Sequence, residues 1–448
     1  MDYFKNKLII SVFLIFTLLG CSTDDQPKEE LEIKVTHFET SYHEVKIEWQ
    51  LTKPKTIIID DLELYRAEKN TESDFYQEVK IANLPSNEVS FIDFDVPYKK
   101  EVIYTVKINY RDESNGKLNV IRGELKSEPQ SFKRDIVIFD QIPFQVEQDQ
   151  LQQDVFHILF RYGSGSLQKY NSNLNTITKT KRFEAATLLN TKFQILDHNT
   201  IFLADAKGII RNIDTESYQI NNTYQVTIED NLKAFAVAGS RIYYLDNDVW
   251  CFYNRSTGYS VNSGIIKNAD YITYLGENKL LFFYTQNGNS LDIWSYTPEN
   301  CPDQKNCNGT HYNSNWENFT NNAVDPNIIS WNKDKTKLIT SIKGGVFNFK
   351  TLKQEQRLFD STGKHYFQCV FDDDDNIYAT VQGEKSIHKF NSNYDLIEVI
   401  PTKLYPLFPL LSKEGLKVIG AYNPISYWNY EYGYGFNFNG SCGIEILK

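Results

Sequence analysis

Short β-strand patterns recur with a period of roughly 40 residues from about residue 131 onward. Each copy has an apolar run, a polar turn and a second apolar run. A strand follows in which an apolar residue is succeeded three positions later by an aromatic or aliphatic one, as in Val249-x-x-Phe252. This period, without helical spacing between the runs, is typical of four-stranded blades arranged in a ring. The first apolar residue of that strand lies at positions 167, 210, 249, 293, 346 and 387.

These copies and the segment from about residue 404 predict a ring of seven blades, with six or eight as alternatives. On this repeat, residues 131–448 resemble the broad β-propeller class, near its NHL-like and WD40-like members. No repeated Trp-Asp or Kelch motif selects a subfamily. One interval is longer because of an insertion around residues 298–322. A β-sandwich with a small barrel is the alternative, but it does not explain so even a period.

Residues 34–130 alternate between apolar and polar positions, which is typical of strands with one face in a core. Trp49 ends one such run, and Tyr104 opens another. The segment resembles a fibronectin type III module, with another immunoglobulin-like sandwich as the alternative. The resemblance implies that Trp49 packs inside the sandwich and that the Tyr104 hydroxyl bonds back to the preceding corner. The predicted fold class is therefore all-β: a sandwich, interpreted as a spacer, followed by a propeller.

The first residues have the pattern of a secretory signal. Two lysines precede an apolar run of about a dozen residues, and Leu18-Leu19-Gly20 leads into Cys21. The run is too short to span a bilayer core of about 30 Å. This pattern resembles the lipobox of bacterial lipoproteins. The resemblance implies that residues 1–20 are removed and that Cys21 carries a diacylglyceryl group and an acylated amino terminus. A secretory signal with a chance cysteine is the alternative.

Residues 21–33 form a polar, acidic segment with too few apolar residues to fold. This tether resembles the acidic export signal of Bacteroidetes lipoproteins. The resemblance implies a protein that is lipid-anchored in the outer membrane and exposed at the cell surface, with the periplasmic face as the alternative. Several acyl chains hold a protein on a membrane durably because each buried methylene contributes about 0.8 kcal/mol. The membrane is therefore one predicted partner.

The charges of the chain argue against several partners and reactions. The formal net charge is -11 at pH 7 and no basic patch stands out, so we expect no nucleic-acid partner. The seven histidines are scattered without metal-ligand spacing, and we expect neither a metal nor a cofactor. The acidic run at residues 372–375 lacks the turn-making glycine of a calcium loop. It is interpreted as a solvated turn.

The cysteines after Cys21 fall into two groups. Cys301 and Cys307 lie close together in a polar loop, and we expect them to form a disulfide worth about 2 kcal/mol on the chain-entropy estimate. The other three lie in apolar, strand-like runs and are interpreted as buried thiols: Cys251, Cys369 and Cys442.

Two segments are candidates for ligand binding. The insertion around residues 298–322 carries Tyr312, Trp316 and Phe319 among many asparagines. Such a loop suits a glycan because sugar rings stack on aromatic side chains and sugar hydroxyls bond to amides, and a disulfide lowers the entropy lost on binding. A loop whose aromatic residues cover their own blade is the alternative.

The second candidate segment is the aromatic run at residues 422–438, which includes Tyr427, Trp428 and Tyr430. In a strand, alternate side chains lie on opposite faces. We expect half of these rings to pack inside the last blade. A binding platform made by the other half is the alternative.

These patterns favour a membrane-anchored lipoprotein whose propeller binds a glycan or a surface protein without catalysis, and no catalytic residue is assigned. A glycan hydrolase or lyase, with carboxylates contributed by different blades, is one alternative. A structural component of an envelope protein complex is another.

Overall fold

The computed structural model describes residues 30–447 apart from internal gaps. The chain divides into two compact units, Met1–Arg134 and Asp135–Lys448. Regular structure in the described residues is almost entirely strand, and the helix described among them is the five-residue α2 (Leu358–Thr362). The gaps are residues 72–76, 117, 150, 162–164, 185–190, 198, 228–231, 267–268, 277–278, 287–289, 298–309, 312–327, 351–352, 426, 431–432 and 437–439.

The first unit is a sandwich of two antiparallel sheets. Its strands are β1 (Glu32–Thr40), β2 (Val45–Thr52), β3 (Ile57–Lys69), β4 (Val79–Leu84), β5 (Ser90–Asp93), β6 (Glu101–Asp112), β7 (Ile121–Lys126) and β8 (Gln130–Lys133). One sheet has the order β1-β2-β5, and the other has the order β4-β3-β6-β7 with β8 also paired to β6. Alternate residues of β2 (Val45, Ile47 and Trp49) are buried, as expected for a strand with one face in the core.

The two aromatic residues singled out in the sequence lie in this core. Trp49 is 3% exposed, and its indole N–H donates to the Glu88 carbonyl at 3.0 Å. Tyr104 is 1% exposed and donates its hydroxyl to Asp93 Oδ2 at 2.7 Å. Arg66 pairs with the same carboxylate at 2.8 Å. Because a buried hydroxyl needs a hydrogen-bond partner, this bond ties β6 to the end of β5.

The first unit ends slightly later than the boundary expected after residue 130. β8 continues the sheet through pairs such as Glu101 with Lys133 and Tyr104 with Gln130. Arg134 N then donates to Lys100 O at 2.8 Å. These backbone bonds keep residues 130–134 in the sandwich, so the division falls between Arg134 and Asp135.

The described residues of the second unit form seven four-stranded antiparallel sheets, numbered in chain order. Sheet 1 contains β10 (Gln145–Gln148), β11 (Val155–Phe160), β12 (Ser166–Asn171) and β13 (Thr176–Arg182). Sheet 2 contains β14 (Gln194–Asp197), β15 (Thr200–Ala204), β16 (Ile209–Asp214) and β17 (Ile220–Gln225). Sheet 3 contains β18 (Leu232–Ala238), β19 (Arg241–Asp246), β20 (Val249–Asn254) and β21 (Tyr259–Ile266).

The remaining sheets follow the same order, except the last. Sheet 4 contains β22 (Tyr271–Gly276), β23 (Lys279–Gln286), β24 (Ser290–Tyr296) and β25 (Thr310–His311). Sheet 5 contains β26 (Ile329–Trp331), β27 (Lys337–Thr340), β28 (Gly345–Asn348) and β29 (Lys353–Arg357). Sheet 6 contains β30 (Tyr366–Phe371), β31 (Ile377–Val381), β32 (Ser386–Phe390) and β33 (Leu396–Pro401). Sheet 7 has the order β34 (Tyr405–Ser412), β35 (Gly415–Ala421), β38 (Cys442–Ile446) and β9 (Ile138–Phe139).

Burial falls toward the outer strand of a sheet. In sheet 1 all six residues of β11 are buried, whereas β13 is largely exposed. Sheet 2 shows the same contrast between β15 and β17. The second strands of these two sheets are covered on both faces by the adjacent sheets and are mostly apolar, whereas the outer strands meet water.

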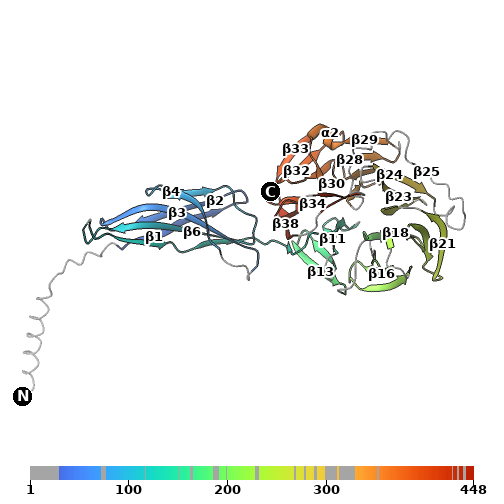
Figure 1. Cartoon of the computed structure of the whole chain (residues 1–448), viewed down its shortest axis with the longest axis horizontal. Helices are drawn as coiled ribbons and strands as arrows, with labels where there is room; N and C mark the ends of the chain where they lie inside the picture. The colour runs from blue at the N-terminus through green and yellow to red at the C-terminus, as the bar shows by residue number, and fades with distance from the viewer. Residues whose placement is uncertain are drawn as a thin grey trace, which may run out of the picture. The chain divides into compact units, whose positions relative to one another are not determined.

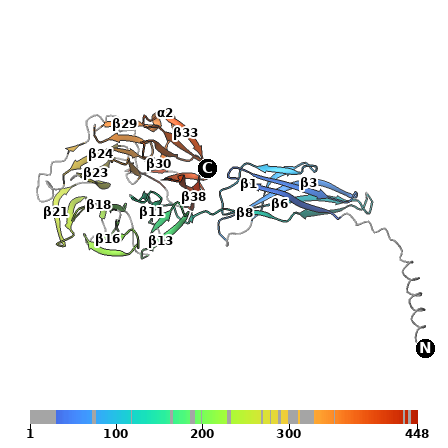
Figure 2. The same ribbon diagram turned by 180° about the vertical axis from the view of Figure 1, so that it is seen from behind.

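Clusters of buried side chains connect each sheet to the next. Phe202 of sheet 2 shares a cluster with Phe235 of sheet 3. A further cluster joins sheet 3 to sheet 4, another joins sheet 4 to sheet 5, and another joins sheet 5 to sheet 6. The rings of Phe367 in sheet 6 and Phe408 in sheet 7 have centroids 5.2 Å apart. The sheets therefore follow one another around a ring, which can be traced by colour in Figures 1 and 2.

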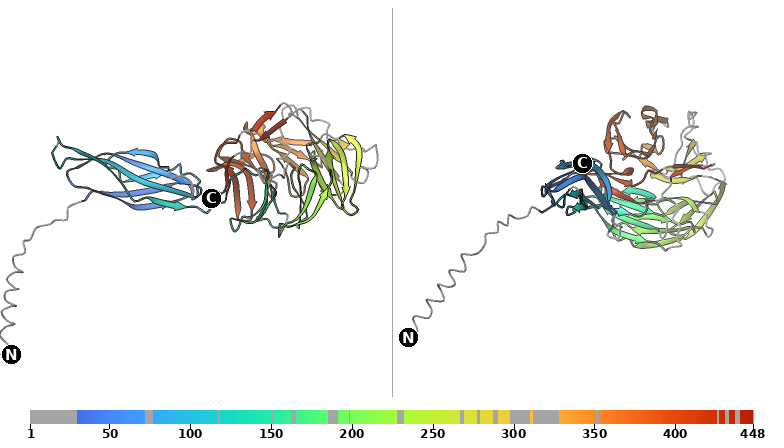
Figure 3. Two further views of the ribbon diagram at one scale, coloured as in Figure 1. Left: turned by 60° about the horizontal axis from the view of Figure 1, so that its bottom comes forward. Right: turned by 60° about the vertical axis from the view of Figure 1, so that its left-hand side comes forward.

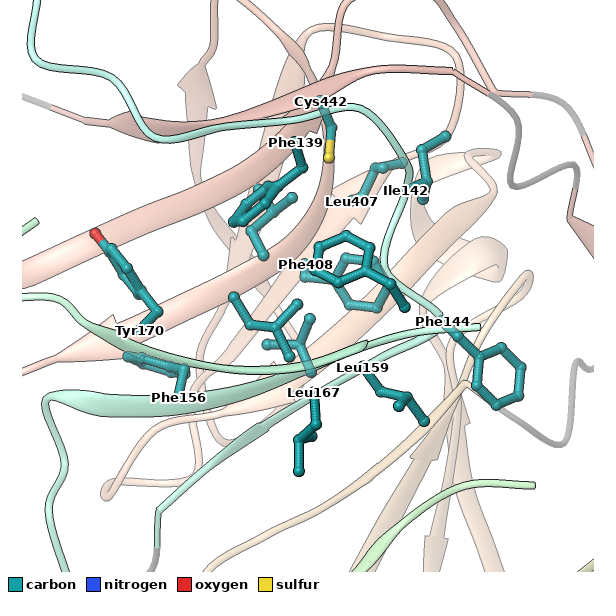
Figure 4. Packing of buried hydrophobic residues seen from close by; sticks show 14 of the residues in the cluster. Phe139, Ile142, Phe144, Phe156, Leu159, Leu167, Tyr170, Leu407, Phe408 and Cys442 are labelled. Atoms are coloured by element: carbon teal, nitrogen blue, oxygen red, sulfur yellow. The ribbon is translucent and has the colours of Figure 1, made fainter. Parts of the chain in front are cut away.

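The start of the second unit closes this ring. β9 is the outer strand of sheet 7, where Phe139 pairs with Cys442 and Ile138 with Gly443. One cluster of buried residues then joins sheet 7 to sheets 1 and 2, and Figure 4 shows part of it around Phe139 and Phe408. Figure 3 shows the sheets from two further sides. The prediction of an all-β chain with a β-propeller is confirmed.

The three cysteines expected to be buried thiols are free and buried. Burial raises the pKa of Cys251 to about 11 and also raises the pKa values of Cys369 and Cys442. A thiol reacts through its thiolate, so these groups are unreactive at neutral pH. They act as small apolar side chains of the core.

The acidic run at residues 372–375 forms the turn between β30 and β31. Lysines of sheet 5 pair with it: Lys333 Nζ lies 3.0 Å from Asp373 Oδ1, and Lys337 Nζ lies 3.1 Å from Asp375 Oδ2. The turn is thus a charged contact between sheets 5 and 6.

Candidate functional site

Most residues predicted to bind a ligand or to be modified lie outside the described part of the chain. These are Cys21, Cys301, Cys307, Tyr312, Trp316 and Phe319. The lipid anchor, the disulfide and the glycan-binding loop therefore stay predictions. In the part of the chain that the structure describes, no helix is long and apolar enough to cross a membrane.

The aromatic run of the last blade forms a hairpin of its own. β36 (Tyr427–Tyr430) pairs with β37 (Gly433–Phe436) as a separate two-stranded sheet. The register places Trp428 opposite Gly435 and Tyr430 opposite Gly433. We expected half of these rings to pack inside the last blade, as part of one of its strands. The strand pairing corrects this for the backbone, because the run is not a strand of sheet 7, and the packing of its side chains stays a prediction. β35 pairs directly with β38, so the segment between them is an insertion into sheet 7.

The segments that flank the hairpin are attached to the ring closure. Tyr422 N donates to Ser441 O at 3.3 Å, so the two chains that leave sheet 7 start side by side. Ile425 is 8% exposed and belongs to the cluster that joins sheets 1 and 7. Cys442 Sγ donates to Gln141 O at 3.2 Å. An insertion fixed at its base loses less entropy on binding than a free loop.

A buried network of titratable groups joins sheets 1 and 2. His157 on β11 is fully buried; its Nδ1 lies 2.7 Å from Tyr218 Oη, and its Nε2 lies 3.2 Å from Asp149 Oδ2. Burial alone would raise the pKa of Asp149, but hydrogen bonds from His157 and from the N–H groups of Gln152 and Leu151 lower it to about 2. The network is enclosed between the sheets, so it stabilises their contact and presents no group to a ligand.

Two glutamines join inner strands of adjacent sheets in the way that backbone groups would. Gln145 of β10 accepts from Phe193 N at 2.7 Å and donates to Phe193 O at 3.0 Å. Gln194 of β14 accepts from Val237 N at 3.0 Å and donates to Phe235 O at 2.5 Å. Each side-chain amide bonds to backbone N–H and C=O groups of the next sheet that have no strand partner on that side. It thereby satisfies backbone groups that would otherwise be buried without a hydrogen bond.

Two buried lysines also reach from one sheet to the next. Lys169 of sheet 1 donates to Thr215 O of sheet 2 at 3.3 Å and pairs with Glu216 at 2.9 Å. Lys417 of sheet 7 donates to Ser172 O of sheet 1, and burial lowers its pKa. These ammonium groups hold neighbouring hairpins together and are not available at the surface.

An open pocket of about 600 Å³ lies on the first unit, where β7 ends and β8 begins. Within it, Lys126 Nζ lies 2.6 Å from Glu78 Oε2 and 5.7 Å from the centroid of the Tyr65 ring. Because this pair is neutral overall, the pocket favours no charged ligand. Its lining residues are Glu78, Ile103, Thr105, Lys126, Ser127, Pro129 and Ser131.

Sequence reasoning missed a polar residue that recurs between the third and fourth strands of the sheets. Asp214 Oδ1, for example, accepts from the N–H groups of Glu216 and Ser217 and so forms the turn. The signal was visible, because in five of the six copies an Asn or Asp lies within two residues of the last position of the apolar-x-x-aromatic or -aliphatic pattern. The residues that accept in this way are Asn171, Asp214, Asn254, Asn348 and Asn391.

No family model matches the chain, and no curated protein matches it. Two similar solved structures are "Crystal structure of RRP9 WD40 repeats", with 11% identity and a TM-score of 0.48, and "Structure of U3-55K", with 11% identity and a TM-score of 0.47. Each comparison covers 70% of this chain and 98% of the other chain. The class of this protein, a β-propeller preceded by a β-sandwich, rests on the strand pairing described above.

Proposed function

We propose that this protein is a lipoprotein anchored in the outer membrane and exposed at the cell surface, whose propeller binds a glycan or a protein partner without catalysis. The lipobox pattern at Cys21 supports the anchor. The observation that carries the binding role is the hairpin β36–β37. It contains Tyr427, Trp428 and Tyr430, and the pairing of sheet 7 does not require it.

The first unit is, in this proposal, a fibronectin type III module that acts as a spacer. Its two sheets of three and five strands support this assignment. So do the burial of Trp49 and the bond from Tyr104 to Asp93 at the end of β5.

Binding is favoured over catalysis by the way this fold uses its perturbed groups. A general base must reach the proton that it removes from a substrate. Asp149 has a strongly lowered pKa, but it is 4% exposed and bonded to the fully buried His157. This pair therefore serves the contact between sheets.

A glycan array and a surface-protein pull-down with the soluble form that starts after Glu30 test the proposal. We expect a hit whose affinity falls at least tenfold in Trp428→Ala, which corresponds to about 1.4 kcal/mol for one lost aromatic contact. Tyr259→Ala is the matched control, because Tyr259 is 66% exposed on β21, outside both candidate segments.

If Trp316→Ala weakens the binding and Trp428→Ala does not, the binding site is assigned to the insertion around residues 298–322. Unchanged affinity in both variants would remove the aromatic segments from the proposal. Hydrolysis of the bound glycan by the purified protein would contradict the proposed non-catalytic role and would favour a glycan hydrolase.

A further inference from the structure

The outer strand of sheet 6 exposes aliphatic side chains along a sheet edge. Among the described strands, β33 pairs only with β32. Its residues Leu396, Ile397 and Val399 are 41%, 53% and 53% exposed. An exposed apolar edge of this kind is a template for pairing with another chain.

The corresponding strands of three other sheets are polar. β13 reads Thr-Ile-Thr-Lys-Thr-Lys-Arg, β17 reads Ile-Asn-Asn-Thr-Tyr-Gln and β29 reads Lys-Gln-Glu-Gln-Arg. Charged and polar residues discourage pairing at an edge. All these strands occupy the same place in their sheets, so the propeller architecture does not require the aliphatic residues of β33.

The backbone of β33 offers hydrogen bonds on its outer side. Thr402, directly after β33, donates its N–H to Lys385 O, directly before β32, at 2.9 Å. The N–H of Thr402 therefore points toward the β32 side. This direction alternates from one residue to the next in an antiparallel pair. The N–H and C=O of Val399 therefore point away from β32, whereas Pro401 has no N–H to offer. The usable edge is centred on Val399 and ends at Pro401.

Leu396 and Val399 extend the buried face of sheet 6 to its rim. The register places Leu396 beside Phe390 and Val399 beside His388, and both of these neighbours are buried. A strand that pairs with β33 would cover Leu396 and Val399 and place its own side chains against them.

We propose that β33 is a docking edge for an extended segment of a partner protein that carries aliphatic residues and a lysine or arginine opposite Glu398. Glu398 is exposed in the middle of β33 and lies opposite Lys389 of β32. A basic residue of an added strand would lie on the other side of the Glu398 carboxylate, and the chain's net charge of -11 attracts a basic segment and repels a second copy. The surface is a different element from the hairpin β36–β37, and the proposal does not depend on the lipid anchor.

The size of the edge also favours an extended segment. A strand of six residues spans about 20 Å. Such an edge cannot supply the roughly 800 Å² per partner of a stable dimer. Backbone hydrogen bonds and two side-chain contacts are instead the interactions by which an extended peptide adds to a sheet.

Fluorescence anisotropy with the full-length protein in detergent tests this proposal. The probe is a labelled nonapeptide of alternating valine and lysine, and a peptide with glutamate in place of lysine is the charge control. We expect the lysine peptide to bind, and Val399→Lys to weaken that binding at least tenfold. Thr223→Lys, at an exposed position of the outer strand β17, is the matched control and should leave the binding unchanged.

Charge reversal and amide exchange give two further readouts. Glu398→Lys should weaken binding of the lysine peptide and strengthen binding of the glutamate peptide, a reversal that misfolding cannot produce. The peptide should also slow amide exchange at Val399 and leave β17 unaffected. The proposal is overturned if the lysine peptide does not bind, or if Val399→Lys binds it as well as the original protein. Self-association that Val399→Lys abolishes would also overturn it, because the occupant would then be a second copy.

Discussion

Single polar side chains join the sheets of this propeller. Gln145 and Gln194 repeat the hydrogen bonds of a strand pair, and His157 bridges Asp149 and Tyr218. These groups are buried or partly buried, where an unsatisfied polar atom costs about 1–3 kcal/mol. Removing one of these side chains therefore costs more than the free energy of the lost hydrogen bond, because the buried group that it bonded is left without a hydrogen-bond partner.

Asp149→Asn tests the contribution of one such group, in the buried network of Asp149, His157 and Tyr218. The folded-state pKa of about 2 lies below the ordinary value of 3.8. The ionised carboxylate therefore stabilises the fold above a pH of about 4, and this contribution is lost as the pH falls toward 2. We expect the substitution to lower the free energy of unfolding by about 2 kcal/mol at pH 7 and by less at pH 3, as measured by urea unfolding.

Asp197→Asn is the control for that substitution, because Asp197 is the exposed last residue of β14. It should change the free energy of unfolding by less than about 0.5 kcal/mol. An equal loss at pH 7 and pH 3 for Asp149→Asn would contradict the role of the charge.

At the scale of elements, the place of a strand in its sheet decides what its residues meet. β11 is buried along its whole length, whereas β13 meets water. The closing strand β9 is the shortest contribution to sheet 7: Ile138 and Phe139 pair with β38, and Val137 O accepts from Ile444 N at 2.9 Å. Much of its attachment therefore depends on packing: Phe139 is 6% exposed, and its ring lies 5.1 Å from that of Phe160.

Phe139→Ala should open this closure. We expect it to lower the free energy of unfolding by about 3–5 kcal/mol, as for other buried phenylalanines. Amide exchange followed by mass spectrometry should become faster in β38 while β19 and β20 stay protected. Leu174→Ala, at a residue 66% exposed in a turn of sheet 1, should leave both unchanged. If amide exchange became equally faster in all sheets, the effect of β9 would not be local to sheet 7.

At the scale of the whole molecule, the two units have separate cores. The core of the first unit surrounds Trp49 and Tyr104. The core of the second unit is a series of clusters, each shared by adjacent sheets. Each unit therefore buries its apolar residues within itself, and the proposed anchor needs only the segment that precedes the first unit.

Cys21→Ser tests the anchor. The serine hydroxyl does not replace the thiolate that takes the diacylglyceryl group, so the protein should move from the membrane fraction to the soluble fraction. It should also lose incorporation of an alkyne-labelled fatty acid, which is measured after coupling to a fluorophore. Ser22→Ala keeps Cys21 and should behave as the original protein. Continued labelling of Cys21→Ser would assign the lipid to another residue.

The repeat and the strand content of the propeller could be predicted from sequence because each blade is a local unit. Its apolar runs recur about every 40 residues, as at Leu167, Ile210 and Val249, whatever the other blades contain. The burial of Trp49 and of Tyr104 was predictable for a similar reason, since the alternation of a strand is written in neighbouring residues.

The contacts between blades were decided only by tertiary structure. His157 and Tyr218 are 61 residues apart in sequence, and neither position has a local pattern that indicates the other. The residues around Trp428 have the alternation of a strand, yet they form a separate hairpin because β35 pairs with β38 and β9 takes the outer edge of sheet 7. Local patterns determine which residues form strands, whereas the choice of a strand's partner depends on which surfaces remain unpaired once the ring has closed.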